Sequence, residues 1–195
     1  MCRKGSRRPF LPPSHIQRIG DGTAVVQLTQ GKVAAIDECD YDLVAGLRWV
    51  ASKASDGLWY AQATIRTPEG KRTSLTMHRL LMGLGRGDHR HVDHEDGNGL
   101  NNRRDNLRIA TVAQNARNRT KRKRTASKYK GVTFLKRQWN LSRPWKSTIY
   151  VDGRNRTVGY FATEEEAAAG YNIAAQSHYG EFARLNELPQ PMTEV

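Results

Sequence analysis

Alternating apolar and polar positions run through the first 82 residues and predict short β-strands. The segments expected to form strands are residues 24–28, 33–36, 58–65 and 73–77. The last two flank a turn at residues 68–71 and predict a hairpin. Residues 41–49 instead have apolar side chains at helical spacing, and residues 78–82 predict another short helical turn. The first half is therefore expected to be rich in β-structure, with two short helical segments.

A strand–turn–strand pattern occupies residues 91–110. Residues 91–94 and 107–110 fit short strands, and the sequence Glu-Asp-Gly-Asn-Gly at 95–99 is strong turn chemistry. The preceding Gly-rich segment 83–87 lacks the adjoining strand and long helix of a nucleotide-binding fingerprint. We interpret it as a flexible connector.

A short helix is predicted directly after this pattern. Thr111 fits the N-cap position, and Gln114 three residues later completes a capping box. Asn115 and Asn118, spaced i and i+3, then lie on one face of the helix. The local order is therefore strand, strand, helix.

The last third of the chain predicts a small sheet with one helix. Strands are expected at residues 129–135, 145–151 and 156–160. Thr163 precedes three glutamates, which is a helix start, and Gly180 is expected to end that helix. The chain is thus assigned to the α+β class, with a three-stranded antiparallel sheet covered on one face by a helix.

The charge of the chain narrows the class of partner. The 195 residues include 32 Lys or Arg and 19 Asp or Glu, a formal net charge of +13. This excess favours nucleic acid, although a ribosomal or membrane-surface protein would share it. No run approaches the roughly eighteen apolar residues of a membrane span, and the basic N-terminus lacks the apolar stretch of a secretory signal.

Basic residues concentrate in residues 117–130, which hold eight Lys or Arg and no acidic residue. One interpretation is a solvated, self-repelling linker, and the other is a segment that lies along a phosphate backbone. Both interpretations can hold at once.

Cysteine use favours an intracellular protein. Cys2 and Cys39 are the only cysteines, so we expect no disulfide framework. Because no Cys-x-x-Cys pair is present, no structural zinc is expected.

Asp93 and His94 have the chemistry of a hydrolytic site for phosphodiesters. Histidine suits a general base because its ordinary pKa lies near neutrality. Carboxylate and amide oxygens, such as those of Asp93 and Asn115, suit a hard divalent cation that neutralises charge on a phosphate. A packing core would not need Asp93, His94, Asn106 and Asn115 in that order.

Residues 91–119, HVDHEDGNGLNNRRDNLRIATVAQNARNR, resemble the HNH (ββα-metal) nuclease motif of phage homing endonucleases, in the variant that ends in asparagine. The resemblance rests on Asn106 and Asn115, which follow His94 by twelve and twenty-one residues. It implies that His94 is the general base and that Asp93 and Asn115 bind Mg²⁺ or Mn²⁺. It also implies that Asn106 braces the loop and orients His94. Asn118 is the alternative ligand to Asn115.

Other histidines surround this segment. His78 precedes Arg79-Leu80-Leu81, a pairing found upstream of the motif in related sequences. It either approaches the site or is a buried structural histidine. His89 and His91 are interpreted as DNA-facing or surface groups.

The last sixty residues, with YKGV at 129–132, GYF at 159–161 and TEEEAA at 163–168, resemble the Apetala-2/ethylene-response-factor (AP2/ERF) DNA-binding domain. Such domains lay their sheet in the major groove of DNA. The side-chain alternation of strands gives the expected contacts Lys130, Lys136, Arg137, Lys146, Thr148, Tyr150, Arg154 and Arg156. The basic segment adds Arg117, Arg119, Lys121, Arg122, Lys123 and Arg124. Where plant domains use arginine and tryptophan, this chain has Thr133, Thr148, Tyr150, Asn155 and Thr157, so we expect more phosphate than base contacts.

The two resemblances imply a metal-dependent HNH DNA endonuclease of mobile or homing type, targeted by its C-terminal domain. The expected parts are a disordered basic arm (1–15), a β-rich region with the nuclease (16–119), a basic linker (120–127), the AP2/ERF-like domain (128–187) and a tail (188–195). The expected partner is double-stranded DNA, nicked by a monomer or cut by a dimer on DNA, with no membrane and no small-molecule substrate. A phage-encoded protein in the cytoplasm of a bacterial host is expected. The alternatives are a non-catalytic, sequence-specific DNA-binding regulator on an inactive HNH scaffold, and an RNA-binding protein.

Overall fold

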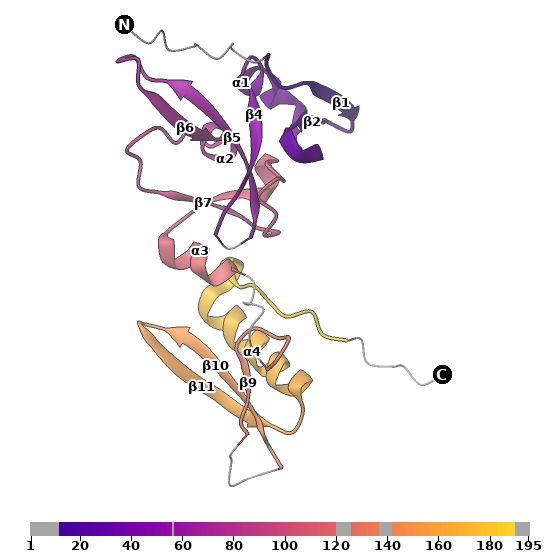
Figure 1. Ribbon diagram of the computed structural model, residues 1–195. Helices are drawn as coiled ribbons and strands as arrows, with labels where there is room; N and C mark the ends of the chain where they lie inside the picture. The colour runs from indigo at the N-terminus through magenta and orange to yellow at the C-terminus, as the bar shows by residue number, and fades with distance from the viewer. Residues whose placement is uncertain (1–11, 56, 120–125, 137–141, 190–195) are drawn as a thin grey trace, which may run out of the picture. The chain divides into compact units, whose positions relative to one another are not determined.

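The computed structural model describes residues 12–55, 57–119, 126–136 and 142–189, and it combines helices and strands as an α+β chain. Its contacts divide the chain into two units, Met1–Ala110 and Thr111–Val195 (Figure 1). The expected DNA contacts Lys121, Arg122, Lys123, Arg124 and Arg137 lie outside the described residues, as do most of the expected arm and tail. Within the described ranges, no helix has both the length and the apolar character needed to cross a membrane.

The described part of the first unit is built from small antiparallel sheets. Their strand orders are β1-β2-β3, β4-β5-β6 and β7-β8. The strands are β1 (Ile16–Gly20), β2 (Thr23–Gln27), β3 (Val33–Asp37), β4 (Trp49–Lys53), β5 (Trp59–Arg66), β6 (Arg72–Thr76), β7 (His91–His94) and β8 (Leu107–Ala110). The helical segments are η1 (Thr29–Gly31), η2 (Glu38–Asp40), α1 (Tyr41–Val44), α2 (Met77–Leu81) and η3 (Arg104–Asn106). The expected β-rich character and the helical turn at 78–82 are confirmed.

One apolar core joins these sheets. Ile36, Trp49 and Met77 are fully or almost fully buried in it, together with Val92 from β7 and Leu107 from β8. A two-stranded ribbon is at best marginally stable alone in water. The β7–β8 ribbon is therefore stabilised by its packing on the upstream sheets.

The helix expected at residues 41–49 is shorter than predicted. Helix α1 ends at Val44, and Trp49 already begins strand β4. Gly46 has a φ of +79°, a left-handed conformation that ends a helix. The Trp49 indole donates to the Val44 carbonyl at 3.0 Å. The helical spacing of apolar residues was misleading here, because Trp49 is buried in the core as the first residue of a strand.

The second unit contains the predicted sheet and helix. The elements are α3 (Val112–Asn118), β9 (Val132–Phe134), β10 (Trp145–Val151), β11 (Arg154–Phe161), α4 (Glu164–Tyr179) and η4 (Gly180–Phe182). The strands form an antiparallel sheet in the order β11-β10-β9, and α4 packs on it (Figure 1). Helix α4 begins with the capping box of Thr163 and Glu166 and ends before Gly180, as expected.

Close packing of α4 on the sheet explains the small residues of this unit. Ile149 of the sheet and Ala167, Tyr171 and Ala175 of the helix are buried. Gly131 has a φ of +75°, and a Cβ added there would lie 2.0 Å from a Tyr171 ring carbon. A side chain at this position would separate the helix from the sheet.

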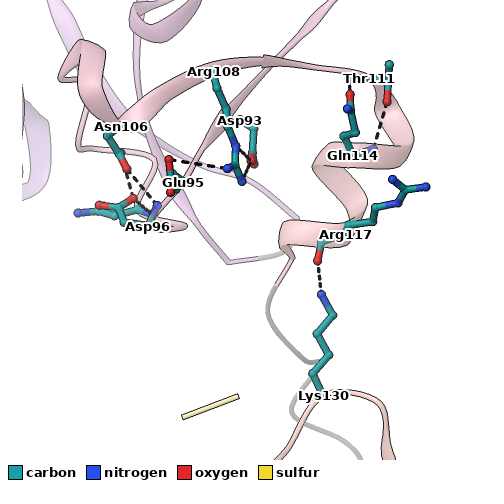
Figure 2. Close-up of polar contacts among 10 residues, drawn as sticks. Asp93, Glu95, Asp96, Asn106, Arg108, Thr111, Gln114, Arg117 and Lys130 are labelled. Atoms are coloured by element: carbon teal, nitrogen blue, oxygen red, sulfur yellow. Dashed lines mark hydrogen bonds and ion pairs between the residues drawn. The ribbon is translucent and has the colours of Figure 1, made fainter. Parts of the chain in front are cut away.

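Helix α3 belongs to the second unit by its contacts. The Arg117 guanidinium lies over the Tyr179 ring, 4.8 Å from its centroid. The Lys130 ammonium donates to the backbone carbonyl of Arg117 at the end of α3 (Figure 2) and to that of Arg119. The contact boundary at 110/111 thus differs from the expected division, which grouped residues 111–119 with the first region. A catalytic domain covering residues 16–119 stays a prediction.

Candidate active site

The β7–β8 ribbon places an aspartate opposite an arginine. Asp93 pairs with Arg108 in the antiparallel register. The Arg108 Nε and Nη2 atoms lie 2.9 and 2.8 Å from Asp93 Oδ2, and Nη1 lies 3.7 Å from a Glu95 oxygen (Figure 2). Asp93 is 4% exposed and the Arg108 side chain 13%. The pair is therefore a largely buried ion pair, and Arg108 is a site residue that sequence reasoning missed.

His94, the next residue on β7, is buried, and burial disfavours the charged, protonated form of its imidazole. Burial lowers the pKa of His94 below its ordinary value, and the Asn102 hydrogen bond and the Asp96 and Asp93 charges only partly oppose this. The imidazole is therefore neutral near pH 7.

Asn102 indicates which of the two ring nitrogens of His94 carries the proton. His94 Nε2 lies 3.4 Å from Asn102 Oδ1. An amide oxygen can only accept, so Nε2 is the donor and the lone pair is on Nδ1. This is the protonation state that a general base at Nδ1 requires.

Asn106 closes the turn that follows His94. Its Oδ1 accepts from the Asp96 backbone N–H at 3.0 Å, and its Nδ2 donates to Asp96 Oδ1 at 3.0 Å and to the Asn101 carbonyl at 2.8 Å (Figure 2). These bonds join Asn106 to two other residues of the turn, and its bracing role stays a prediction. His94 Nε2, however, hydrogen-bonds to the Oδ1 atom of Asn102, a residue that the motif had not singled out.

Strand β3 holds the far side of the same loop through the backbone. The Ala35 N–H donates to the Leu100 carbonyl at 2.9 Å, and the Asn102 N–H donates to the Ala35 carbonyl at 2.8 Å. The bonds fix Asn102, and with it the partner of His94.

Two carboxylates upstream anchor the segment that leads into β8. Asp37 accepts from Arg103 Nε at 3.2 Å and from the Arg104 N–H at 2.7 Å. Asp40, which is buried, pairs with the Arg104 guanidinium at 2.6 Å. The upstream sheets therefore brace the loop by hydrogen bonds and ion pairs as well as by packing.

Replacing Asn106 tests whether it holds the loop. Asn106→Ala leaves the Asp96 N–H and the Asn101 carbonyl without their partner, so we expect the free energy of unfolding to fall by about 2 kcal/mol. Urea unfolding followed by circular dichroism measures the change. Asp105→Ala, at an exposed neighbouring carboxylate, is the matched control and should change stability by less than about 0.5 kcal/mol. Equal effects of the two variants would contradict the bracing role.

His78 contacts the His94 ring. The two ring centroids are 5.0 Å apart with the planes at 87°, and Tyr60 lies 5.7 Å from His78 and 5.8 Å from His94. The sequence left open whether His78 approaches the site, and the structure places it there.

The Gly-rich segment 83–87 is held in place. The Arg79 guanidinium donates to the carbonyls of Gly85, Asp88 and Arg90 at 3.1, 2.8 and 2.8 Å. The segment is a connector, as expected, but Arg79 restrains it ahead of β7.

The two candidate asparagines of α3 differ in exposure. The capping box of Thr111 and Gln114 forms as predicted (Figure 2). Asn115 is half-buried, whereas Asn118 is buried in the second unit. Asn115 is the more accessible of the two to a ligand.

The two expected metal ligands belong to different units of the chain. Among the residues that the structure describes, no three His, Cys, Asp or Glu side chains are grouped to hold a metal ion. The expected ligands are instead one carboxylate, Asp93, and one amide, Asn115, and their oxygens are of the type that Mg²⁺ and Mn²⁺ accept.

The outer face of the C-terminal sheet carries part of the expected DNA-contact set. Lys146, Thr148 and Tyr150 alternate with the buried Ser147 and Ile149, so they point away from α4. Arg154 and Arg156 pair with Val151 and Ile149 and so share the helix side of the sheet, although both are exposed. Simple alternation assumed that even-numbered residues of both strands face the same side. Because the turn has two residues, 152 and 153, even-numbered residues after it lie opposite odd-numbered residues before it and share their side.

The remaining described basic residues fall into two groups. Lys136 and Arg119 are exposed. Lys130 and Arg117 instead make the contacts inside the unit given above. Burial, together with the Arg184 charge, lowers the pKa of Lys130 to about 8. These contacts make Lys130 and Arg117 less available to a phosphate backbone than the exposed pair.

A known family model covers the segment that carries these residues. The family model described as HNH endonuclease matches residues 77–117, which include His78, Asp93, His94, Asn106 and Asn115. An "Uncharacterized HNH endonuclease L560" of Acanthamoeba polyphaga mimivirus is 38% identical over 98 residues, 50% of this chain and 48% of that protein. "Protein 3.8" of Escherichia phage T7 is 32% identical over 95 residues, 49% of this chain and 74% of that protein.

The share of each relative that the match covers differs between the two proteins. The match spans about half the length of the mimivirus protein but about three quarters of the phage protein. No solved structure matches the chain. The chain therefore belongs to the same family as Protein 3.8 of phage T7, and it carries an HNH endonuclease domain at residues 77–117.

Proposed function

We propose that the protein is a metal-dependent HNH endonuclease that hydrolyses phosphodiester bonds of double-stranded DNA, in a ββα-metal arrangement. The observation that carries the proposal is His94, a buried, neutral imidazole with its Nε2 proton directed to Asn102, beside Asp93 on one strand. This combination suits a general base next to a cation ligand.

Each site residue has a role in this proposal. His94 Nδ1 takes the proton of the attacking water, and Asn102 keeps the other ring nitrogen protonated. Asp93 and Asn115 would hold Mg²⁺ or Mn²⁺, which would neutralise charge on the phosphate and the leaving oxygen. Asn106 holds the loop, and Arg108 orients the Asp93 carboxylate.

The C-terminal sheet is proposed as an AP2/ERF-like DNA-targeting surface. Linking a weakly selective nuclease to a second DNA-binding unit raises its effective concentration near chosen sites. Each chain carries a single HNH segment, so we propose nicking by a monomer, with double-strand cutting by two chains. A mobile or homing element encoded by a virus, acting in the cytoplasm of its host, is the proposed context.

The outer sheet face is tested by removing one charge. Lys146→Ala is expected to weaken DNA binding and to reduce the slope of log K against log salt by about 1, because one phosphate contact is lost. Fluorescence anisotropy across a salt series measures the DNA affinity and this slope. Gln176→Ala, on the exposed side of α4, is the control. An unchanged slope for Lys146→Ala would remove this residue from the DNA surface.

Binding and cleavage must be measured together, because the alternative is a DNA-binding regulator on an inactive scaffold. A labelled duplex incubated with the full chain in Mg²⁺ should yield cleaved strands with a 5′-phosphate and a 3′-hydroxyl, as is usual for HNH enzymes. Retarded but intact duplex at every metal concentration would support the regulator and contradict the nuclease. Binding to RNA in preference to the duplex would contradict both.

A further inference from the structure

The ring of the proposed base is packed against two other rings. The His78 and His94 centroids are 5.0 Å apart and the planes almost perpendicular, so the edge of one ring meets the face of the other. Tyr60 lies within 6 Å of both, tilted by 56° from His94. Such edge-to-face arrangements are preferred by aromatic pairs and constrain their relative orientation.

His78 is itself held from a different part of the fold. It is the second residue of α2, directly after β6, and its Nε2 lies 3.2 Å from the Thr76 hydroxyl oxygen. Burial, the repulsion that a protonated His94 would exert and the Arg79 charge lower the pKa of His78 to about 3. A neutral, anchored ring can therefore lie beside His94 without repelling it when His94 takes a proton.

Tyr60 is fixed by the loop that follows His94. A Cβ added to Gly99 would lie 2.6 Å from two carbons of the Tyr60 ring, so the ring packs directly on the loop backbone. Strand β5 and the loop thus hold Tyr60, and strand β6 and α2 hold His78. The two rings reach His94 from separate elements.

The hydrogen bond to Asn102 needs this support. At 3.4 Å it is long for an N–H···O bond, whose usual length is about 2.9 Å. A bond of this length selects the protonated nitrogen but restrains rotation of the ring only weakly. Packing by flat rings adds a further restraint on the orientation of the His94 ring.

We propose that His78 and Tyr60 are positioning residues that hold the His94 ring with Nδ1 directed at the water that attacks the phosphodiester. The inference rests on the proposed function. It assigns His78 no proton transfer of its own, and it requires a flat ring at position 78 rather than an imidazole. Misplacing a catalytic group by about 1 Å can cost about a hundredfold in rate.

The test compares His78→Phe with His78→Leu in steady-state nicking by the full chain, from which kcat and the KM for DNA are both obtained. Phenylalanine keeps a flat ring and should keep kcat within about threefold, whereas leucine fills the space without orienting His94 and should lower kcat by about ten- to a hundredfold with KM unchanged. Wild-type kcat in His78→Leu would overturn the inference. A fall of equal size in both variants would also overturn it, because a core-filling or imidazole-specific role would then apply.

A second pair covers the case in which His78→Leu does not fold. Tyr60→Phe should keep kcat and Tyr60→Leu should lower it, and equal rates in the two would overturn the inference. His94→Ala separates this proposal from the function it rests on. Full nicking by His94→Ala would remove the proposed function, whereas an inactive His94→Ala beside a fully active His78→Leu would remove only the positioning role.

Discussion

His94→Ala is expected to lower the rate of metal-dependent DNA nicking by about 10²- to 10⁴-fold, which is the usual contribution of a general base. The imidazole is buried, neutral and oriented, and no other group at the ribbon is proposed to take the proton. Single-turnover nicking at saturating protein measures the rate. DNA affinity should stay within a factor of about two, because a group that acts on the transition state contributes little to ground-state binding.

His178→Ala is the matched control for this result. His178 is exposed in the last turn of α4, and no role at the site or on the DNA surface is assigned to it. It should nick at the wild-type rate. If both histidine variants lost activity equally, or if His94→Ala remained fully active, His94 would not be the base.

Asp93→Ala is expected to abolish nicking and also to destabilise the first unit by about 3 kcal/mol, because it leaves the Arg108 guanidinium largely buried without its main partner. The Arg108 contact to Glu95, at 3.7 Å and to an exposed carboxylate, offsets only a small part of this. Urea unfolding and nicking, measured on the same preparation, separate the two effects.

The double variant Asp93→Ala/Arg108→Leu distinguishes metal binding from folding. Replacing both members of a buried ion pair by apolar groups removes the unpaired charge, so most of the lost stability should return. Nicking should not return, because the carboxylate ligand is still absent. Recovered activity would show that Asp93 serves only as the partner of Arg108.

The sequence predicted best where local chemistry decides the structure. The capping boxes at Thr111 and Thr163, the turn at 95–99 and the strands at 91–94 and 107–110 all depend on neighbours within a few residues, and all are present. The same locality brought Asp93 and His94 together on one strand. Their neighbourhood was therefore predictable before any tertiary contact was known.

Residues that reach the site across the fold were not predictable in this way. Asn102, Arg108 and Tyr60 contact His94 or Asp93 through cross-strand pairing and packing, and nothing in their spacing marks them. Arg108 carried one signal, since it stands in the predicted strand opposite β7, but the register of a ribbon is needed to pair it with Asp93.

Strand register also explains why the sequence assigned Arg154 and Arg156 to the wrong side of the C-terminal sheet. Simple alternation grouped Arg154 and Arg156 with Lys146 and Tyr150, but the two-residue turn after Val151 places them on the other side. A pairing irregularity between Ser147 and Thr148 adds one residue to the opposite strand. Beyond it, the even-numbered Lys146 and Tyr160 are paired again. Side-chain direction across a hairpin therefore depends on the turn, which composition does not determine.

The central claim, that this chain is a metal-dependent nuclease, is tested most directly on supercoiled plasmid. The full chain is incubated with the plasmid in Mg²⁺, in EDTA, and in EDTA followed by excess Mg²⁺, and open circles are quantified on a gel. Nicking that appears with Mg²⁺, stops with EDTA and returns when Mg²⁺ is restored is the predicted result. Plasmid that stays supercoiled at every Mg²⁺ and Mn²⁺ concentration, with DNA binding intact, would contradict the account.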